Sequence, residues 1–262
     1  MIIALTCFNR VSTLKKTVES LMKCKDIESV PIYYYGDWIG GDWGVLGVEQ
    51  YINEVKRPID KHYYLESLHI GLKSNAYNAI TDGLTHADEI IWLQDDMEFS
   101  EDFLRFMQFA LHKYKKDPEI MFVSGYSPVT HHSLYLSPYL SEALGIWRRK
   151  YSYPNKISKD LSGFRKFAGD QAYNMLIDAE KGRDSISPYL YYSMYENNAY
   201  CLHPNRNKLR HLTTDSINSK AKDAKKFNQN LYEGFSERID SGNLDLVKRY
   251  SPIKKFTRWL RR

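Results

Sequence analysis

The sequence predicts an α/β fold, with a mixed, mostly parallel sheet flanked by helices in a single domain. Three observations lead to this prediction. Short apolar runs alternate along the chain with segments of helical periodicity. The 262 residues suffice for one large α/β domain, and a hydrophobic content of 43% indicates a packed core. Polar or charged residues follow several apolar runs directly, as they do at the carboxyl edge of a parallel sheet.

The first part of the chain alternates strands with helices. Strands are expected at residues 2–8, 30–35, 62–68 and 89–93, and helices up to residue 23, at 74–84 and at 101–116. Leu14, Val18 and Leu21 fall on one face at helical spacing, and Pro118 follows the last of these helices. The glycine-rich residues 40–44 are expected to form a loop.

Beyond residue 120 the pattern is less regular. A strand is expected at 120–123, followed by a loop rich in Tyr, Ser and Pro. Helices are expected at about 169–181 and 186–197. The stretch from 209 to 230 is polar and basic, and we interpret it as a flap.

The net charge of +5 is unevenly distributed. From Cys201 to Arg262 there are 15 Lys and Arg against 6 Asp and Glu, whereas the first 200 residues carry 22 against 26. Near the C-terminus, four apolar residues fall at helical spacing among basic ones: Ile253, Phe256, Trp259 and Leu260. This tail is expected either to bind an anionic membrane surface or to dock on its own domain.

Composition excludes several classes of protein. No apolar run approaches the roughly 18 residues that a membrane span needs. Three cysteines, an odd number without metal-ligand spacing, favour a reduced chain in the cytoplasm. The sequence contains no phosphate-binding glycine loop, zinc motif, Ser-His-Asp order or dinucleotide fingerprint.

An acidic turn follows the predicted strand at 89–93. Asp95 and Asp96 come directly after Gln94, and adjacent carboxylates at a strand end suit Mg²⁺ or Mn²⁺ that also binds a diphosphate. The alternative is a solvated turn that caps the next helix. Because carboxyl ends of parallel strands share one edge, this turn should converge with Asn9-Arg10 and with Asp37.

A series of motifs resembles the nucleotide-sugar glycosyltransferases of the Rossmann-like GT-A fold. Within them, the motifs are most similar to enzymes of the bacterial surface-glycan type that resemble glycosyltransferase family 2 or N-acetylglucosaminyltransferases. The run from Ala4 to Arg10 resembles their "T-x-Y/F-N-R" end of the first strand, and residues 71–78 resemble their Gly-and-Asn-bearing helix start. Gln94-Asp95-Asp96 resembles D-x-D or E-D-D, with Gln in place of the first acid. Residues 145–149 are similar to "W-G-x-x-W-R-R", and 198–209 resemble a late strand.

The resemblance implies an inverting, metal-dependent transfer of a sugar from a nucleoside diphosphate sugar, with UDP-sugar favoured and Mn²⁺ or Mg²⁺ as cofactor. Asp96 would be the direct metal ligand, Asp95 would hold ribose or sugar hydroxyls, and Gln94 would orient water or sugar or simply face solvent. The other implied donor-side residues are Thr6, Phe8, Asn9, Arg10, Asp37, Lys73, Asn75 and Asn78. Arg10 suits diphosphate geometry, whereas Asp37 is equally well interpreted as a turn residue.

The catalytic base is expected to be a carboxylate near the acceptor hydroxyl. The resemblance points to Asp184, although the flanking Trp of the family is absent here, and Asp170 is the rival. Either could simply cap a helix. His211, or alternatively His203, could bind the metal, and Trp147 with Arg148 could line the acceptor site, a core Trp being the alternative.

The predicted organisation has three parts: a nucleotide-sugar-binding half at 1–97, an acceptor-binding and catalytic half at 98–235, and the basic tail at 236–262. The implied acceptor is a glycan or lipid-linked hydroxyl in surface polysaccharide biosynthesis, at the cytoplasmic face of the cell membrane.

Other functions stay open at this stage. A sugar-phosphate nucleotidyltransferase would need a glycine-rich loop with a basic residue after the first strand, and Phe8-Asn9-Arg10 lacks it. A catalytically degenerate relative that only binds nucleotide or glycan is suggested by Gln94. Nucleic-acid binding is suggested only by the tail, so we expect no nucleic-acid partner.

Overall fold

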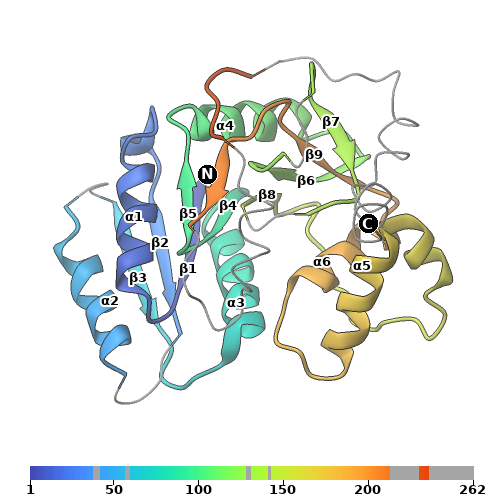
Figure 1. The fold of residues 1–262 in the computed structure, drawn as a ribbon, viewed down its shortest axis with the longest axis horizontal. Helices are drawn as coiled ribbons and strands as arrows, with labels where there is room; N and C mark the ends of the chain where they lie inside the picture. Colours follow the sequence, from blue (N-terminus) through green and yellow to red (C-terminus); the bar gives the residue numbers. More distant parts are fainter. Residues whose placement is uncertain (38–41, 57–59, 128–130, 141–142, 213–229, 236–262) are drawn as a thin grey trace, which may run out of the picture.

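The computed structural model describes residues 1–37, 42–56, 60–127, 131–140, 143–212 and 230–235 (Figure 1). The helices are α1 (Val11–Leu21), α2 (Trp43–Glu54), α3 (Gly71–His86), α4 (Phe103–Tyr114), α5 (Ser162–Glu180) and α6 (Ser187–Glu196), with a short 3₁₀ turn at Ile27–Ser29. The strands are β1 (Ile2–Cys7), β2 (Ile32–Gly36), β3 (Lys61–Leu65), β4 (Glu89–Gln94), β5 (Met97–Phe99), β6 (Ile120–Ser124), β7 (Tyr135–Ser137), β8 (Leu144–Trp147), β9 (Tyr200–His203) and β10 (Leu209–His211).

Eight of the described strands form one sheet in the order β3-β2-β1-β4-β8-β6-β9-β7. The pairs β3–β2, β2–β1 and β1–β4 are parallel, and β6–β9 is parallel as well. β8 runs antiparallel to both β4 and β6, and β7 runs antiparallel to β9. The predicted fold class, a mixed and mostly parallel sheet flanked by helices, is therefore confirmed.

Burial on both faces explains why the central strands are apolar throughout. All six residues of β1 are buried, and so are the four central residues of β4. A parallel sheet covered on both faces requires such continuous apolar runs. β1 therefore lies between β2 and β4 with no solvent on either side, which makes it the rigid base of the edge where these strands end.

Two apolar clusters cover the two faces of the sheet. One joins it to α1, α2 and α4 and includes Leu14, Val48 and Phe106. The other joins it to α3, α5 and α6 and includes Ile80 and Phe164. In Figure 1, α1 and α2 lie to one side of the parallel strands, and α5 with α6 lies at the other end of the molecule. Both clusters contain residues from before and after position 97. The predicted halves 1–97 and 98–235 therefore contribute to the same sheet and to both apolar clusters.

Helix α2 is an element that the sequence pattern did not predict. Its glycines favour a loop locally, but Asp42 caps the helix by accepting a hydrogen bond from the Gly44 N–H at 2.7 Å. Three residues of the helix itself are buried: Val45, Val48 and Ile52. Tertiary packing therefore outweighs the weak helix propensity of this segment.

The strands β5, β7, β8 and β10 were not predicted either. Each has only three or four residues, which is too short to display a periodicity. The most informative are β5 and β10, which pair antiparallel as a separate ribbon, with His211 opposite Met97. This ribbon brings the late part of the chain next to the acidic turn.

A buried ion pair fastens residues 230–235 to the start of α4. The Nζ of Lys208 lies 2.8 Å from Oδ2 of Asp102 and also donates to the carbonyls of Tyr232 and Gly234. Lys208 is fully buried and Asp102 is 6% exposed. Burial lowers the pKa of Lys208, and its hydrogen bond to Asp102 opposes that effect. The remainder of the flap, 213–229, and the tail, 236–262, lie outside the described residues.

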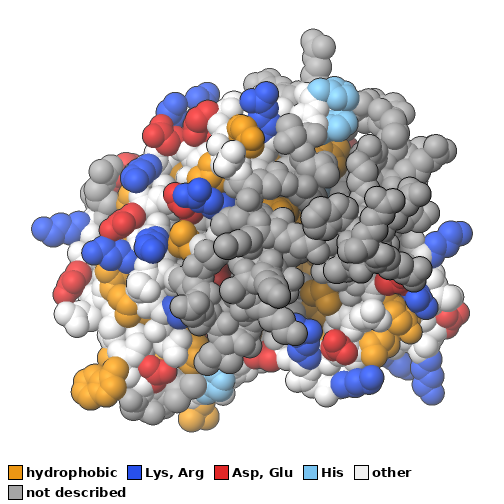
Figure 2. Space-filling view, in the orientation of Figure 1, with side chains coloured by type: hydrophobic (Ala, Val, Ile, Leu, Met, Phe, Trp, Pro, Cys, Tyr) orange, Lys and Arg blue, Asp and Glu red, His pale blue; other side chains and the backbone are white. Residues whose placement is uncertain are grey.

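Among the described residues, none of the helices is both long and apolar enough to cross a membrane. On the face shown in Figure 2, basic and acidic side chains are interspersed over the described surface. Of the 15 basic residues after position 200, 12 lie in 213–229 or 236–262, so most of the basic surplus falls outside the described residues.

The buried pair gives a prediction about stability. Lys208→Met should lower the free energy of unfolding by about 3–5 kcal/mol, because it leaves the Asp102 carboxylate buried without its cation. Arg210→Met is the matched control, since its partner Glu98 is partly exposed, and it should change stability by about 1 kcal/mol or less. Urea unfolding of both variants measures the difference. Equal losses in the two variants would contradict the assignment of Lys208 as an anchor.

Candidate functional site

The candidate site lies where β1, β2 and β4 end at the same edge of the sheet. The register places Thr6 beside both Tyr35 and Gln94, so the residues that follow the three strands must meet. Asp37 donates its backbone N–H to the Cys7 carbonyl at 3.1 Å. The predicted convergence of the three strand ends is therefore confirmed.

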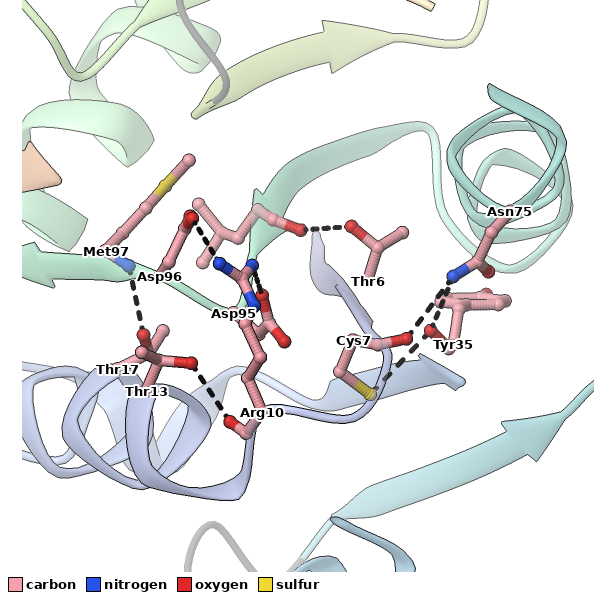
Figure 3. Close-up of polar contacts among 11 residues, drawn as sticks. Thr6, Cys7, Arg10, Thr13, Thr17, Tyr35, Asn75, Asp95, Asp96 and Met97 are labelled. Atoms are coloured by element: carbon pink, nitrogen blue, oxygen red, sulfur yellow. Dashed lines mark hydrogen bonds and ion pairs between the residues drawn. The ribbon is translucent and has the colours of Figure 1, made fainter. Parts of the chain in front are cut away.

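Arg10 forms the centre of the site by bridging both carboxylates of the acidic turn (Figure 3). Its Nη2 lies 2.5 Å from Oδ1 of Asp95, and its Nη1 lies 3.0 Å from Oδ2 of Asp96. Burial lowers the pKa of Arg10, but the charges of the two aspartates outweigh this effect and raise it. A planar guanidinium can bridge two acceptors in this way because its donors form a fixed fork.

Asp95 is a buried charge with an incomplete set of partners. Only 3% of the residue is exposed, and this burial raises its pKa to about 6. Arg10 acts against that rise, and the neighbouring Asp96 adds to it. A hydrogen bond from the backbone N–H of Phe8 also lowers the pKa of Asp95. The single guanidinium therefore does not fully compensate for the loss of water around this carboxylate.

Each aspartate of the pair also has one buried oxygen without a hydrogen bond of ordinary geometry: Oδ2 of Asp95 and Oδ1 of Asp96. Buried carboxylate oxygens normally have a partner, so these two indicate a place for a ligand. Two carboxylates fit a Mg²⁺ or Mn²⁺ ion whose other ligands are waters and phosphate oxygens. The described residues contain no group of three or more His, Cys, Asp or Glu that could hold a metal alone.

His211, predicted as a metal ligand, is brought to this neighbourhood by the β5–β10 ribbon. The Leu212 N–H donates to the Asp96 carbonyl at 2.7 Å, and His211 lies opposite Met97. The His211 ring lies beside Tyr126, with centroids 6.4 Å apart. His203, the alternative, is fully buried between the carbonyls of Tyr126 and Tyr139, and burial lowers its pKa to about 4.

Asp37 organises the start of α3. Its two carboxylate oxygens accept the backbone N–H groups of Ile70 and Gly71 at 2.9 and 3.0 Å. His69, which the sequence pattern did not single out, places Nδ1 2.8 Å from the same carboxylate and stacks on Phe8 with centroids 5.5 Å apart. Asp37 thus contacts the start of a helix that is distant in the sequence, at the same edge as the acidic pair.

Asp184 contacts the same helix terminus from the other side. Its carboxylate accepts the N–H groups of Leu72 and Lys73 at 2.6 and 2.7 Å. Gly71 has φ +83°, and a Cβ there would lie 2.6 Å from Oδ2 of Asp184, so only glycine fits. Asp170 instead pairs with Arg165 on the exposed surface of α5, at 2.6 Å. Of the two predicted bases, Asp184 alone contacts the first turn of α3, the helix whose start Asp37 also holds.

The remaining donor-side candidates mainly hold the edge together. Thr6 donates to the Leu93 carbonyl, Asn75 reaches the carbonyls of Tyr35 and Cys7, and Asn78 donates to Glu66. Asn9 donates to Asp42 at 2.9 Å, which connects the end of β1 to the cap of α2. Lys73 extends its Nζ over the Tyr189 ring, 4.1 Å from the centroid. Gln94, at the end of β4, is half-buried.

The structure places Trp147 and Arg148, which were predicted to line the acceptor site, far from the acidic turn. Because β8 is antiparallel to β4, Trp147 pairs with Glu89 at the opposite edge of the sheet. Gln94 lies five positions further along β4 than Glu89, which corresponds to about 17 Å. Trp147 is a core residue that donates to the Leu111 carbonyl, and Arg148 pairs with Asp88. A local motif could not reveal this strand reversal.

No family model matches the chain, and no curated protein matches it either. Among solved structures it is similar to S. aureus TarS 1–349, with 10% identity and a TM-score of 0.49, over 80% of this chain and 60% of that one. It is similar to the mannosyltransferase PcManGT from Pyrobaculum calidifontis in complex with GDP-Man and Mn²⁺, with 12% identity and a TM-score of 0.43, over 74% and 69%.

A third similar structure is GalNAc-T7 with UDP, GalNAc and Mn²⁺, at 14% identity and a TM-score of 0.48, over 78% of this chain and 42% of that one. The chain thus spans less than two thirds of TarS 1–349 and less than half of GalNAc-T7. At these identities the similarity concerns the course of the chain alone.

The pKa of Asp95 gives a prediction about pH. The folded protein holds the Asp95 proton more tightly than the unfolded chain, so ionisation of Asp95 lowers the free energy of unfolding as pH rises from about 4 to about 6. Asp95→Asn removes this loss. The variant should be more stable than the wild type at pH 8, by about 3 kcal/mol at most, with little difference near pH 4.

Urea unfolding at both pH values measures this difference. The control is Asp88→Asn, because Asp88 is exposed and lies just before the first residue of β4. Its difference in stability from the wild type should not change between pH 4 and pH 8. An Asp95→Asn variant that is less stable than the wild type at pH 8 would contradict the interpretation of Asp95 as an undercompensated buried charge.

Proposed function

We propose that this chain is a glycosyltransferase that uses a nucleoside diphosphate sugar as donor. The observation that carries the proposal is the Asp95–Asp96 pair, bridged by Arg10 and retaining one buried, unpartnered oxygen on each carboxylate. It lies outside the carboxyl ends of parallel strands, where ligands of open α/β sheets bind. The ordered motifs from Thr6 to Asp96 lie at this same edge, and they are the ones that resemble the donor side of GT-A enzymes.

The donor diphosphate would bind beside Arg10 and the acidic pair. Asp96 would ligate a Mg²⁺ or Mn²⁺ ion, and Asp95 would accept hydrogen bonds from ribose or sugar hydroxyls. A divalent cation held there neutralises the leaving diphosphate as a Lewis acid. The base and ribose would lie beside the α3 start, which Asp37 holds, and beside the stacked rings of Phe8 and His69. A UDP-sugar is the favoured donor.

We assign Asp184 as the base for an inverting displacement. The proton of an acceptor hydroxyl passes to its carboxylate, a new bond forms between that oxygen and the anomeric carbon, and the bond from this carbon to the diphosphate breaks. Asp184 already accepts two backbone N–H bonds, and a carboxylate has lone pairs for more. The acceptor is expected to be a glycan or lipid-linked hydroxyl of a surface polysaccharide, reached at the cytoplasmic face of the cell membrane.

Nucleotide binding is the first test of this function. UDP or GDP with Mn²⁺ should raise the melting temperature of the wild type, since a ligand at a hundred times its dissociation constant adds about 2.7 kcal/mol of stability. Asp96→Asn should abolish the part of the shift that requires Mn²⁺. Asp88→Asn, an exposed aspartate at the opposite end of β4, should retain all of it.

A melting temperature that no nucleoside diphosphate changes, with or without Mn²⁺, would refute the donor site. A shift without any sugar transfer or donor hydrolysis would instead favour a degenerate relative that only binds nucleotide.

The assignment of the base has its own test. Asp184→Asn should lower kcat by about 10²- to 10⁴-fold, the usual contribution of a positioned base, while nucleotide binding persists. Asp170→Asn, on the exposed surface of α5, should leave kcat within about twofold. The measurement is release of nucleoside diphosphate in the presence of acceptor. The reverse result for the two variants would assign the base to Asp170.

A further inference from the structure

Arg10 neutralises part of the negative charge with which the acidic pair would attract an added cation. Its guanidinium contacts one oxygen of each aspartate, and the second oxygen of each remains buried without a partner. Two carboxylates and one guanidinium leave a net charge of −1 at this point. Without the guanidinium the net charge would be −2, and it would attract a divalent cation much more strongly.

The backbone of Arg10 is held at the start of α1, whereas its side chain is partly exposed to solvent. The carbonyl of Arg10 accepts the N–H of Leu14 and the hydroxyl of Thr13, which anchors the residue at the start of α1. Its side chain is 32% exposed, whereas that of Asp95 is 4% exposed. A change of partner can therefore occur by rotation of the Arg10 side chain alone, without displacement of α1 or the sheet.

A diphosphate offers the guanidinium an alternative partner of the same geometry. Arginine binds phosphate through the same paired N–H donors with which it binds carboxylates. Once Arg10 contacts a diphosphate, the acidic pair recovers its full charge, and the phosphate oxygens complete the ligand set of a divalent ion. Each ligand then removes an obstacle to the other.

We propose that Arg10 is a resident counter-cation of Asp95 and Asp96, which makes divalent-metal binding conditional on a nucleoside diphosphate. Metal and nucleotide each bind more tightly in the presence of the other, by the same factor, as linkage requires. The nucleotide part rests on the proposed function. The competition between guanidinium and metal does not, because it involves only these three side chains.

The test measures Mn²⁺ binding to the protein alone, by electron paramagnetic resonance of free Mn²⁺ at pH 8 with no nucleotide present. Arg10→Met and Arg10→Gln should each bind Mn²⁺ at least tenfold more tightly than the wild type, within the usual range of coupling between linked sites. Arg10→Lys retains the charge and should stay within about threefold of the wild type. Asp96→Asn added to Arg10→Met should abolish the gain.

A second series repeats the titration with UDP and with GDP. The wild type should gain Mn²⁺ affinity when nucleotide is added, and Arg10→Met should gain much less because its obstacle is already absent. If neither nucleotide binds, the proposed donor site fails while the gain of Arg10→Met without nucleotide still supports the counter-cation.

Two results would overturn the inference. In the first, Arg10→Met and Arg10→Gln both bind Mn²⁺ with an affinity within twofold of the wild type, and circular dichroism shows that at least one of the two is folded. The second is a gain in Arg10→Lys equal to that in Arg10→Met, because the positive charge would then not be what excludes the metal.

Discussion

The parallel pairing of β1 with β2 and β4 is the constraint on which the rest of the site depends. It aligns the last residues of the three strands, with Thr6 level with Tyr35 on one side and Gln94 on the other. Arg10 then starts α1 within reach of Asp95 and Asp96, and Asp37 starts the connection toward α3. Because β1 is buried on both faces, no strand of this group can slip without exposing apolar residues.

The site is rich in carboxylates that are held by donors from other parts of the chain. Asp37 and Asp184 together take four successive N–H groups at the start of α3, from Ile70 to Lys73. A helix start lacks intrahelical partners for these groups and favours negative charge, so both effects stabilise the arrangement. The same arrangement holds the loop after β2 and the loop before α6 together at one edge.

Two of the buried aspartates, Asp95 and Asp102, differ in how well their charge is compensated. Asp102 has a fully buried Lys208, and the Gly234 N–H also reaches it, so this pair acts as an anchor. Asp95 has one partly exposed guanidinium, and burial still raises its pKa. Stable proteins rarely keep an undercompensated charge without a function, which is why the acidic turn rather than the Lys208 pair marks the candidate site.

Apart from α2, the alternation of strands and helices up to α4 follows from the amino-acid sequence alone, and so does the meeting of Arg10, Asp37 and Asp95 at one edge. Local apolar runs and helical periodicity carry that information, and parallel strands convert it into position. It did not reveal α2, whose glycines read as a loop, or the three-residue strands β5 and β10 that bring His211 beside the acidic turn.

Tertiary structure alone decided the direction of β8, and with it the place of Trp147 in the core at the far edge. Strand direction depends on long-range pairing, to which a run of four apolar residues contributes no signal. It also decided the partners of the charged groups: Arg10 with both aspartates, Asp184 with α3, and Asp170 with Arg165. These contacts mostly join residues that are far apart in the sequence, so composition and spacing could name the candidates but could not assign their partners.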